Sequence, residues 1–525
     1  MKIRPPHLLI VLCLGAACWL VWRKAGTEEV ASERPPLREP TPEKNLSRSA
    51  RAEEEAREKK PRPEESFREE LASRRNERIV TFKSDAAYQK AIGELEKQGF
   101  RILGRIDRLR ALRVGYDELS RLEAALGDDA ELARNYLVTP PALPEGTVQA
   151  NAAGFGNDYL AWLGIREDHS SWGAGVTIAI LDTGVVAHDS LPADFKQISL
   201  VEGGAEANGH GTAVASLASA VAPAADLLSV QIAGADGVSD SFTLAQGIFA
   251  ALENGAQVIN ISMGSAYESS VVSEAIAAAS AQGAVIVASS GNNGVNYATS
   301  PASHPDVISV GAVDANTQHL NFSNTDASLS TSAPGYEVYA AWPGDLGIAF
   351  TGTSASAPLT AGGVAAVLSQ SGAANAGVAA NLLLTYSNEA GDPGSDPAFG
   401  QGTIDVGRAV NHNTPGIYDL AVASQSYLVA STANASGLQV SIENRGTETL
   451  YNSTVNIQVN GQNYAQTIGQ LAPAERSVIT LPIGLTELQS GGSLSVTSSA
   501  SVSGGTSDGN SANNSRSDVI SLSTP

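Results

Sequence analysis

The central part of the chain alternates between apolar runs typical of β-strands and helical segments made of small residues. This alternation predicts parallel strands in one sheet, with helices covering both faces. The chemistry of such a sheet lies at the carboxyl ends of its strands, where side chains distant in sequence meet. The expected strands are Val176–Leu181, Leu227–Ile232, Val258–Ile261 and Val285–Ala288, and the expected helices are His210–Ala218, Thr243–Leu252 and Ser270–Ala281. We therefore expect an α/β fold with a doubly wound parallel sheet.

Three polar residues stand where such a sheet places its chemistry. Asp182 ends an apolar strand, His210 lies between glycines at the start of a helix, and Ser354 precedes the alanine-rich helical run 362–371. Taken singly, each has an ordinary explanation as a turn residue, a loop histidine or a helix cap. Together they supply a carboxylate that orients an imidazole, an imidazole that accepts a proton and a hydroxyl that attacks. The sequence thus predicts an activated serine nucleophile.

The residues around these three positions resemble the motifs of the subtilisin-like serine proteases, the subtilase family. The motifs are a strand ending in Asp-Thr-Gly at 182–184, a helix starting with His-Gly-Thr at 210–212, and Gly-Thr-Ser-Ala-Ser-Ala-Pro at 352–358. The resemblance covers roughly residues 155–410, with the motifs in the family's order. Ala355 stands where the family often has Met, and Ser356 where it often has Ala; neither departure touches the reacting atoms. The resemblance implies a subtilisin-like serine endopeptidase.

The same resemblance implies an oxyanion site and a substrate cleft. The segment 290–294 is similar to the family's Ala-Gly-Asn-x-Gly, so we expect the side-chain amide of Asn292 and the backbone N–H of Ser354 to bind the oxyanion. An edge strand would pair with any extended peptide, which predicts protein or peptide substrates. The expected walls of the pocket are Ser262, Met263 and Gly264 on one side and Ser289, Ser290 and Gly291 on the other. Neither wall contains an acid, so no strict preference for Lys or Arg is expected.

This chemistry requires no cofactor, and no metal-binding residue is assigned. Many subtilases carry a calcium-binding loop within the histidine helix, but here residues 215–220 run directly into Val221-Ala222-Pro223-Ala224. We expect that calcium site to be missing. The acidic loops Asp392–Asp396 and Asp508–Asn514 are compatible with Ca²⁺, although ordinary Asp-Pro-Gly and Asp-Gly turns have the same composition.

Charge divides the chain near residue 140. Of the 33 Lys and Arg residues and the 55 acids, 27 and 24 lie in residues 1–140, a net charge of +3; 6 and 31 lie in residues 141–525, a net charge of −25. Lys196 is the single lysine of the later part. We therefore expect it to bind neither nucleic acid nor an anionic membrane. Both cysteines, Cys13 and Cys18, precede it, so it is expected to lack disulfides.

The first 157 residues divide into four expected parts. The apolar run Leu8–Trp22 between basic residues predicts a signal peptide or membrane anchor over residues 1–25, hence export, with membrane contact through this segment alone. Residues 26–77, rich in Glu, Arg, Lys and Pro, predict a disordered linker. Strand and helix patterns over residues 78–140 resemble the α+β propeptide domain that precedes many subtilases; an unrelated spacer domain is the alternative. Residues 141–157 would form an extended processing linker, with the propeptide as a bound inhibitor.

A second β-rich region follows the peptidase region, which we expect over residues 158–412. Residues 416–525 are rich in Ser, Thr, Asn and Gly and show period-two alternation with turns such as Asn460-Gly461. This pattern predicts an antiparallel β-sandwich, and several of its segments resemble CARDB-type bacterial surface domains. Attachment to a surface or substrate and a passive stabilising role both remain open.

Two classes of function fit these observations. The first is a secreted or surface-tethered serine endopeptidase that processes its own precursor. The second is a catalytically silent surface-binding protein that retains the fold. A protein that has lost its enzymatic activity usually lacks one of the reacting residues. Here all four are present: Asp182, His210, Asn292 and Ser354. The sequence therefore favours the peptidase.

Overall fold

We analysed the chain in a computed structural model that describes residues 68–143, 146, 148–202, 208–428, 437–483, 492–503 and 507–521. These residues belong to one compact unit, Pro63–Pro525. The expected signal or anchor segment and residues 26–67 of the expected linker lie outside the described residues. The linker was expected to reach residue 77, but a strand already begins at Ser73. Within the described ranges, no helix is both long and apolar enough to cross a membrane.

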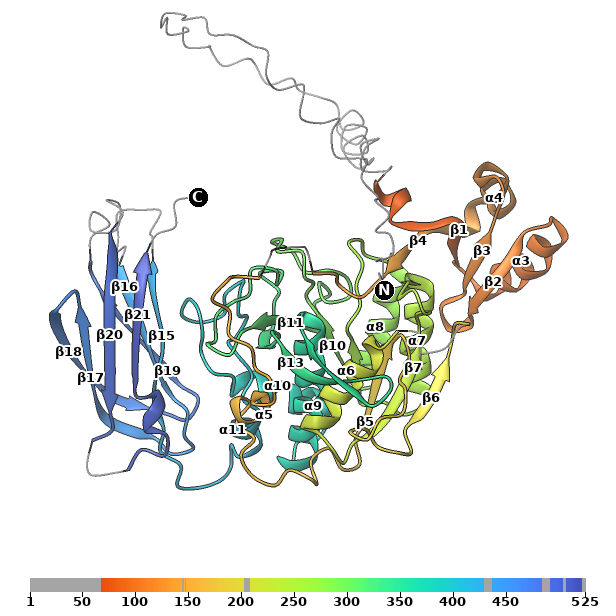
Figure 1. The fold of residues 1–525 in the computed structure, drawn as a ribbon. Coiled ribbons are helices and arrows are strands. Elements are labelled where there is room, and N and C mark those ends of the chain that lie inside the picture. Colours follow the sequence, from red (N-terminus) through yellow and green to blue (C-terminus); the bar gives the residue numbers. More distant parts are fainter. Residues whose placement is uncertain are drawn as a thin grey trace, which may run out of the picture. The chain divides into compact units, whose positions relative to one another are not determined.

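A parallel sheet of seven strands forms the centre of the fold (Figure 1). In spatial order its strands are β12 (Thr331–Pro334), β11 (Val307–Val313), β10 (Val285–Ser289), β9 (Val258–Ile261), β5 (Thr177–Asp182), β7 (Asp226–Gln231) and β6 (Lys196–Ser199). Strand β5 pairs in parallel with β7 on one side and with β9 on the other. The chain therefore changes direction across the sheet at β5, and Asp182 ends that strand.

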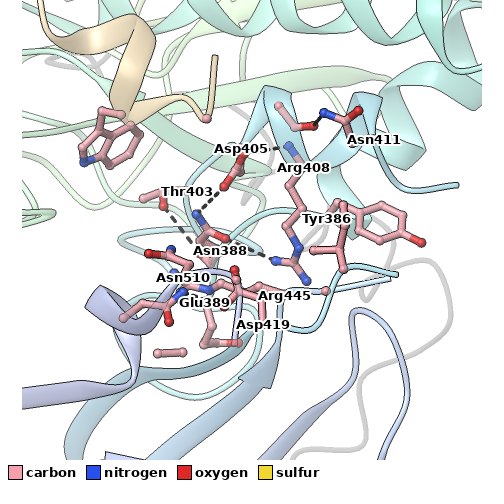
Figure 2. Close-up of a pocket in the computed structure, with 18 of the residues that line it drawn as sticks. Tyr386, Asn388, Glu389, Thr403, Asp405, Arg408, Asn411, Asp419, Arg445 and Asn510 are labelled. Carbon is pink, nitrogen blue, oxygen red and sulfur yellow. Dashed lines mark hydrogen bonds between the residues drawn. The ribbon is translucent and has the colours of Figure 1, made fainter. Parts of the chain in front are cut away.

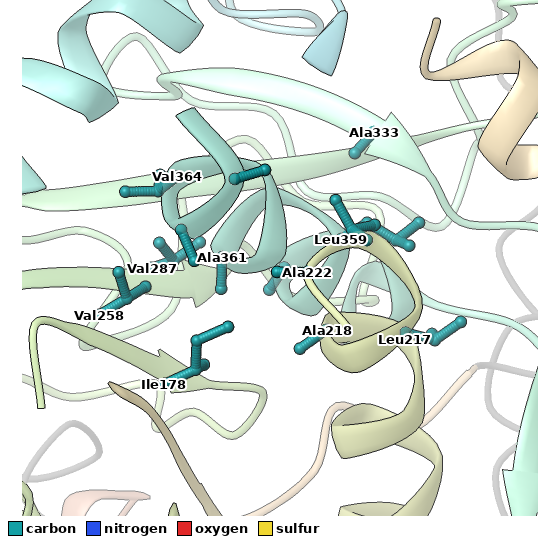
Figure 3. Close-up of a cluster of buried hydrophobic side chains, with 14 of the residues drawn as sticks. Ile178, Leu217, Ala218, Ala222, Val258, Val287, Ala333, Leu359, Ala361 and Val364 are labelled. Carbon is teal, nitrogen blue, oxygen red and sulfur yellow. The ribbon is translucent and has the colours of Figure 1, made fainter. Parts of the chain in front are cut away.

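Helices cover both faces of this sheet because its strands are apolar on both sides. Along β5, Ile178 and Ile180 belong to one buried cluster and Ala179 and Leu181 to another. The first cluster, part of which is drawn in Figure 3, packs the sheet against helices α6 and α9; the second packs it against α7 and α8. The helices of this part are α5 (Tyr159–Trp162), α6 (His210–Val221), α7 (Ser241–Glu253), α8 (Ser270–Ala281), α9 (Thr353–Gln370), α10 (Ala376–Thr385) and α11 (Val406–Val410).

Small residues let α6 and α9 cross at close range in the first cluster. A β-carbon placed on Gly362 of α9 would lie 2.7 Å from the carbonyl oxygen of Ala218 in α6, closer than real side chains approach. This contact fixes the start of α9 relative to the start of α6. Those two starts carry Ser354 and His210.

A smaller α+β unit precedes the part that contains the parallel sheet, residues 158–412, which we call the peptidase part after the sequence prediction. Its strands are β1 (Ser73–Phe82), β2 (Arg101–Ile106), β3 (Ala111–Gly115) and β4 (Ala130–Val138), and its helices are α3 (Asp85–Lys97) and α4 (Leu119–Leu126). Tyr88 and Leu95 of α3 and Leu122 of α4 pack on this sheet in a core of their own. At its edge, β4 pairs with β8 (Ser239–Asp240), a short strand of the peptidase part. The sheet therefore continues from one unit into the other.

An antiparallel β-sandwich follows. One sheet contains β15 (Leu420–Leu428), β16 (Gly437–Asn444) and β19 (Arg476–Leu481); the other contains β17 (Leu450–Val459), β18 (Gln462–Leu471), β20 (Ser493–Ser501) and β21 (Ser515–Ser521). Residues of both sheets form one apolar cluster. Together with the parallel sheet and the preceding α+β unit, this confirms the predicted fold class.

Buried ion pairs join the sandwich to the peptidase part. The Glu443 side chain of β16 is fully buried and lies 2.7 Å from Nη1 of Arg408 in α11 and 3.0 Å from Nε of Arg445. Arg476 of β19 lies 2.8 Å from Glu389, which belongs to the peptidase part. Because breaking a buried ion pair leaves an uncompensated charge, these contacts hold the sandwich in place.

Candidate active site

The end of β5 and the start of α6 bring Asp182 and His210 together. The Nδ1 atom of His210 lies 2.8 Å from Oδ1 and 3.0 Å from Oδ2 of Asp182, which is fully buried. Thr183 links the two elements, because its N–H donates to Asp182 Oδ1 and its hydroxyl accepts from the N–H of Gly211. The strand end and the helix start are therefore held in one geometry.

This contact determines which nitrogen of His210 acts as a base. An ionised carboxylate only accepts hydrogen bonds, so the Nδ1 atom that faces Asp182 carries the proton in the neutral ring. Nε2, on the other side of the ring, is then left with its lone pair. The ring also packs edge-on against Phe350, with 5.4 Å between the ring centroids. His210 is thus oriented by a carboxylate on one side and an aromatic ring on another.

Ser354 occupies the first turn of α9, among N–H groups that have no partner within the helix. Gly352, the N-cap, has φ of +135°, and a β-carbon on it would lie 2.7 Å from the amide nitrogen of Asn292. Pro358 removes the N–H that would bond to the carbonyl of Ser354, and that carbonyl instead accepts from the Ser262 hydroxyl at 3.2 Å. The Ser354 hydroxyl donates to the carbonyl of Ser262 at 3.3 Å. These two contacts join the start of α9 to the end of β9.

Asn292 lies beyond the end of β10 with its side chain held in one orientation. Its Oδ1 accepts from the N–H of Thr353 at 2.9 Å and from the Thr353 hydroxyl at 2.8 Å. Since Oδ1 accepts from both groups, the amide nitrogen points the other way. There it donates to the backbone carbonyl of Pro141 at 2.8 Å. The backbone carbonyl of Pro141 therefore accepts a hydrogen bond from the amide group that we expect to bind the oxyanion.

The two predicted walls of the substrate pocket lie beside this point. Gly264 exchanges both backbone hydrogen bonds with Thr139, and the N–H of Gly291 donates to the hydroxyl of Thr353. Ser262 and Met263 are fully buried, as are Ser289 and Ser290. The assignment of these residues to a substrate pocket stays a prediction.

In the acidic loops considered for calcium, one carboxylate oxygen of Asp396 and both of Asp508 accept hydrogen bonds from the protein itself. Asp396 Oδ1 accepts from the N–H groups of Ala398 and Phe399, and Asp508 accepts from the N–H groups of Leu420 and Asn510. Among the described residues, no group of three or more His, Cys, Asp or Glu side chains could hold a metal ion.

A cavity of about 550 Å³ lies elsewhere, between the peptidase part and the sandwich (Figure 2). Glu389, Arg408, Asp419 and Arg445 are among the residues that line it. None of Asp182, His210, Asn292 and Ser354 lines this cavity. It is separate from the candidate active site.

Sequence reasoning missed several residues that position this site. Thr183 and Thr353 were visible inside the quoted motifs, but their hydrogen bonds join elements that only the fold brings together. Phe350 precedes its motif and carries no local signal. Thr139 stood at the end of the expected propeptide-like domain and Pro141 at the start of the expected processing linker, and the pairing of Thr139 with Gly264 could not be read from the sequence.

Comparison with known proteins agrees with this architecture. The model of the Subtilase family matches residues 173–402. Subtilisin BL from Lederbergia lenta is 36% identical over 214 residues, which cover 37% of this chain and 77% of that protein. Subtilisin DY from Bacillus licheniformis is 34% identical over 253 residues, which cover 45% of this chain and 90% of that protein.

A solved structure resembles the fold over a longer stretch. Fervidolysin from Fervidobacterium pennivorans, described as a keratinolytic enzyme related to subtilisin, has a TM-score of 0.54 and 16% sequence identity, and the match covers 81% of this chain and 87% of that chain. At this identity the likeness concerns the fold alone. The family is established by the sequence relatives: this chain belongs to the subtilase family of serine endopeptidases.

Proposed function

We propose that Asp182, His210, Ser354 and Asn292 form the active site with which the enzyme hydrolyses peptide bonds in proteins. Ser354 Oγ attacks the carbonyl carbon of an extended substrate and passes its proton to Nε2 of His210. Asp182 keeps the other ring nitrogen protonated and stabilises the imidazolium that forms. His210 then delivers the proton to the leaving amine, and water releases the acyl group by the same route in reverse.

Asn292 supplies the electrostatic part of this mechanism. Its amide and the backbone N–H of Ser354 would both donate to the oxygen on which negative charge develops. Such donors accelerate the reaction because they are already in place and need no reorganisation. The observation that carries the proposal is the peptide carbonyl of Pro141, 2.8 Å from the Asn292 amide, two residues after Thr139, which pairs with Gly264.

All these roles belong to groups of the chain, so the proposed chemistry needs no cofactor.

We also propose that the α+β unit serves as the enzyme's own inhibitory propeptide. Arg74 and Arg113 of that unit lie 3.1 and 3.2 Å from Asp240, a buried carboxylate that caps α7 of the peptidase part. Together with β4, these contacts support a propeptide bound across the cleft. We further propose that residues 1–25 direct export of the protein. This part of the proposal is supported by the sequence pattern alone.

Substitution of the nucleophile tests the function. Ser354→Ala should abolish casein hydrolysis, with a loss of about 10⁶ in kcat, a magnitude established on subtilisin itself. Ser356→Ala is the matched control, because it makes the same change two residues along α9, where the hydroxyl donates to the carbonyls of Ala333 and Pro334. Casein hydrolysis by Ser354→Ala at close to the wild-type rate would refute the assignment.

A further inference from the structure

The strand that leaves the α+β unit continues into the cleft. Leu137 and Val138 pair antiparallel with Asp240 and Ser239 of β8. Thr139 then pairs with Gly264 on the opposite side: the Thr139 N–H donates to Gly264 O at 3.0 Å, and the Gly264 N–H donates to Thr139 O at 2.9 Å. The segment is therefore bonded to both edges of the cleft, as an extended peptide substrate would be.

The carbonyl of Pro141 marks the position of the reaction along this segment. It accepts from the Asn292 amide at 2.8 Å, the group proposed to hold the oxyanion. In the reaction, the carbonyl oxygen that becomes the oxyanion is bound by the Asn292 amide. Ser354 therefore attacks the carbon of the carbonyl that accepts from this amide. Pro141 is then the residue directly before the scissile bond. Pro140 is the second residue before that bond, and Thr139 is the third.

We propose that Pro141–Ala142 is the bond that the enzyme cleaves in its own precursor, an inference that rests on the proposed function. Ser354 Oγ bonds to the Pro141 carbonyl carbon while His210 takes the proton. The bond to the Ala142 nitrogen breaks as His210 returns that proton to it, leaving a free amine on Ala142. Water then hydrolyses the ester between Pro141 and Ser354, which yields a carboxylate on Pro141 and restores the hydroxyl.

The register also explains how proline affects this step. Thr139 and Gly264 form a hydrogen-bonded pair, and the next such pair of an antiparallel ladder lies two residues further on each strand, so Pro141 faces Ser262. An ordinary residue at 141 would donate its N–H to the carbonyl of Ser262. Proline has no N–H, and that carbonyl accepts from the Ser354 hydroxyl instead. The bond is therefore placed for cleavage but lacks one substrate contact, which slows maturation.

A second feature of the segment indicates the substrate class. The Val138 side chain, the fourth before the bond, is 1% exposed and belongs to the same apolar cluster as Met263 and Ile232. The enzyme should therefore accept extended peptides with an apolar residue at this position and proline directly before the cleaved bond. Ala142 on the other side of the bond is exposed, so the following residue meets little constraint.

The N-terminus of the mature wild-type enzyme tests the bond. The full chain is allowed to mature, and the larger product is sequenced from its N-terminus while hydrolysis of Val-Thr-Pro-Pro p-nitroanilide is followed in parallel. The expected N-terminus is Ala142, with Ser354→Ala remaining at precursor length. Another N-terminus in an enzyme that hydrolyses peptides would overturn the register and leave the proposed function standing. An Ala142 terminus in Ser354→Ala would assign the cut to another protease and overturn the proposal.

The role of the missing N–H is tested by a pair of variants. Pro141→Ala should mature about 2- to 10-fold faster at the same bond, the effect of one added hydrogen bond. Pro140→Ala restores an N–H that does not face Ser262, so its maturation rate should stay within about twofold of wild type. A Pro141→Ala precursor that matures no faster than wild type would refute the argument from the missing contact. Loss of both maturation and peptide hydrolysis in the wild type would instead refute the proposed function.

Discussion

Replacement of Asn292 by alanine separates the catalytic use of this residue from its structural use. The Asn292 amide is one of two proposed oxyanion donors, and it already lies 2.8 Å from a peptide carbonyl. Removal of one such donor lowers kcat by about 10²–10³, or about 2.7–4 kcal/mol, a magnitude established on subtilisin itself. KM should change little, because the donor acts on charge that develops only in the transition state.

The structural use of Asn292 has a different readout. Its Oδ1 accepts from the N–H and hydroxyl of Thr353, so alanine leaves a buried backbone donor without this partner. That loss costs about 1–3 kcal/mol of folding stability and does not enter kcat. The assay is kcat and KM on one peptide p-nitroanilide, together with the unfolding midpoint. Asn293→Ala is the control, since the Asn293 side chain lies one residue outside the proposed oxyanion site. Equal losses of kcat in the two variants would refute the assignment.

Two further predictions concern the buried ion pairs. Both are tested by measuring the free energy of unfolding in the Ser354→Ala variant, which cannot digest itself. Burial by itself raises the pKa of Glu443, but Arg408, Arg445 and Arg476 outweigh it and bring that pKa to about 2; the stability that Glu443 supplies is therefore present above pH 4.5 and lost as the pH falls toward 2. Glu443→Gln should lower the free energy of unfolding at pH 7 by about 3–5 kcal/mol, because the guanidinium groups of Arg408 and Arg445 lose their anion, and a loss below about 1 kcal/mol would contradict this. Burial raises the pKa of Glu389 to about 7 against the pull of Arg476, with Glu443 and Asp396 adding to the rise. The folded state thus holds this proton more tightly than the unfolded state, so stability should fall between pH 4.5 and 7 and Glu389→Gln should flatten that slope; an unchanged slope would exclude Glu389 as its source.

Much of the fold could be predicted because its pattern is local. Strand and helix periodicities predicted the sandwich and four of the seven strands of the parallel sheet, β5, β7, β9 and β10, since each of these elements has its own apolar periodicity. Strands β6, β11 and β12 were not among the expected strands. The start of α9 was less accessible: the alanine-rich run suggested a helix over residues 362–371, but the helix begins at Thr353. Pro358 can lie inside it because Ser262 bonds to the carbonyl that proline leaves free. That compensation comes from another strand and has no local signal.

The candidate site divides in the same way. Asp182, His210, Asn292 and Ser354 were nominated by motifs, and their catalytic roles stay a prediction. The contacts that orient them join residues far apart in the chain, such as Thr353 with Asn292, and depend on the packing of α9 against the sheet. The buried ion pair of Glu443 with Arg408 joins two parts of the chain whose patterns are independent, so neither pattern predicts it. The position of Pro141 depends on a strand pairing that begins in the preceding α+β unit.

The most direct test of the central claim is covalent labelling of the mature enzyme with a fluorophosphonate, followed by peptide mapping of the adduct. A serine activated by His210 should react, whereas an ordinary hydroxyl does not. The account predicts a single adduct on Ser354 and none in a His210→Ala variant that retains the wild-type circular dichroism spectrum. An adduct on another serine, or an unlabelled Ser354 in a preparation that hydrolyses casein, would contradict the claim that Ser354 is the nucleophile.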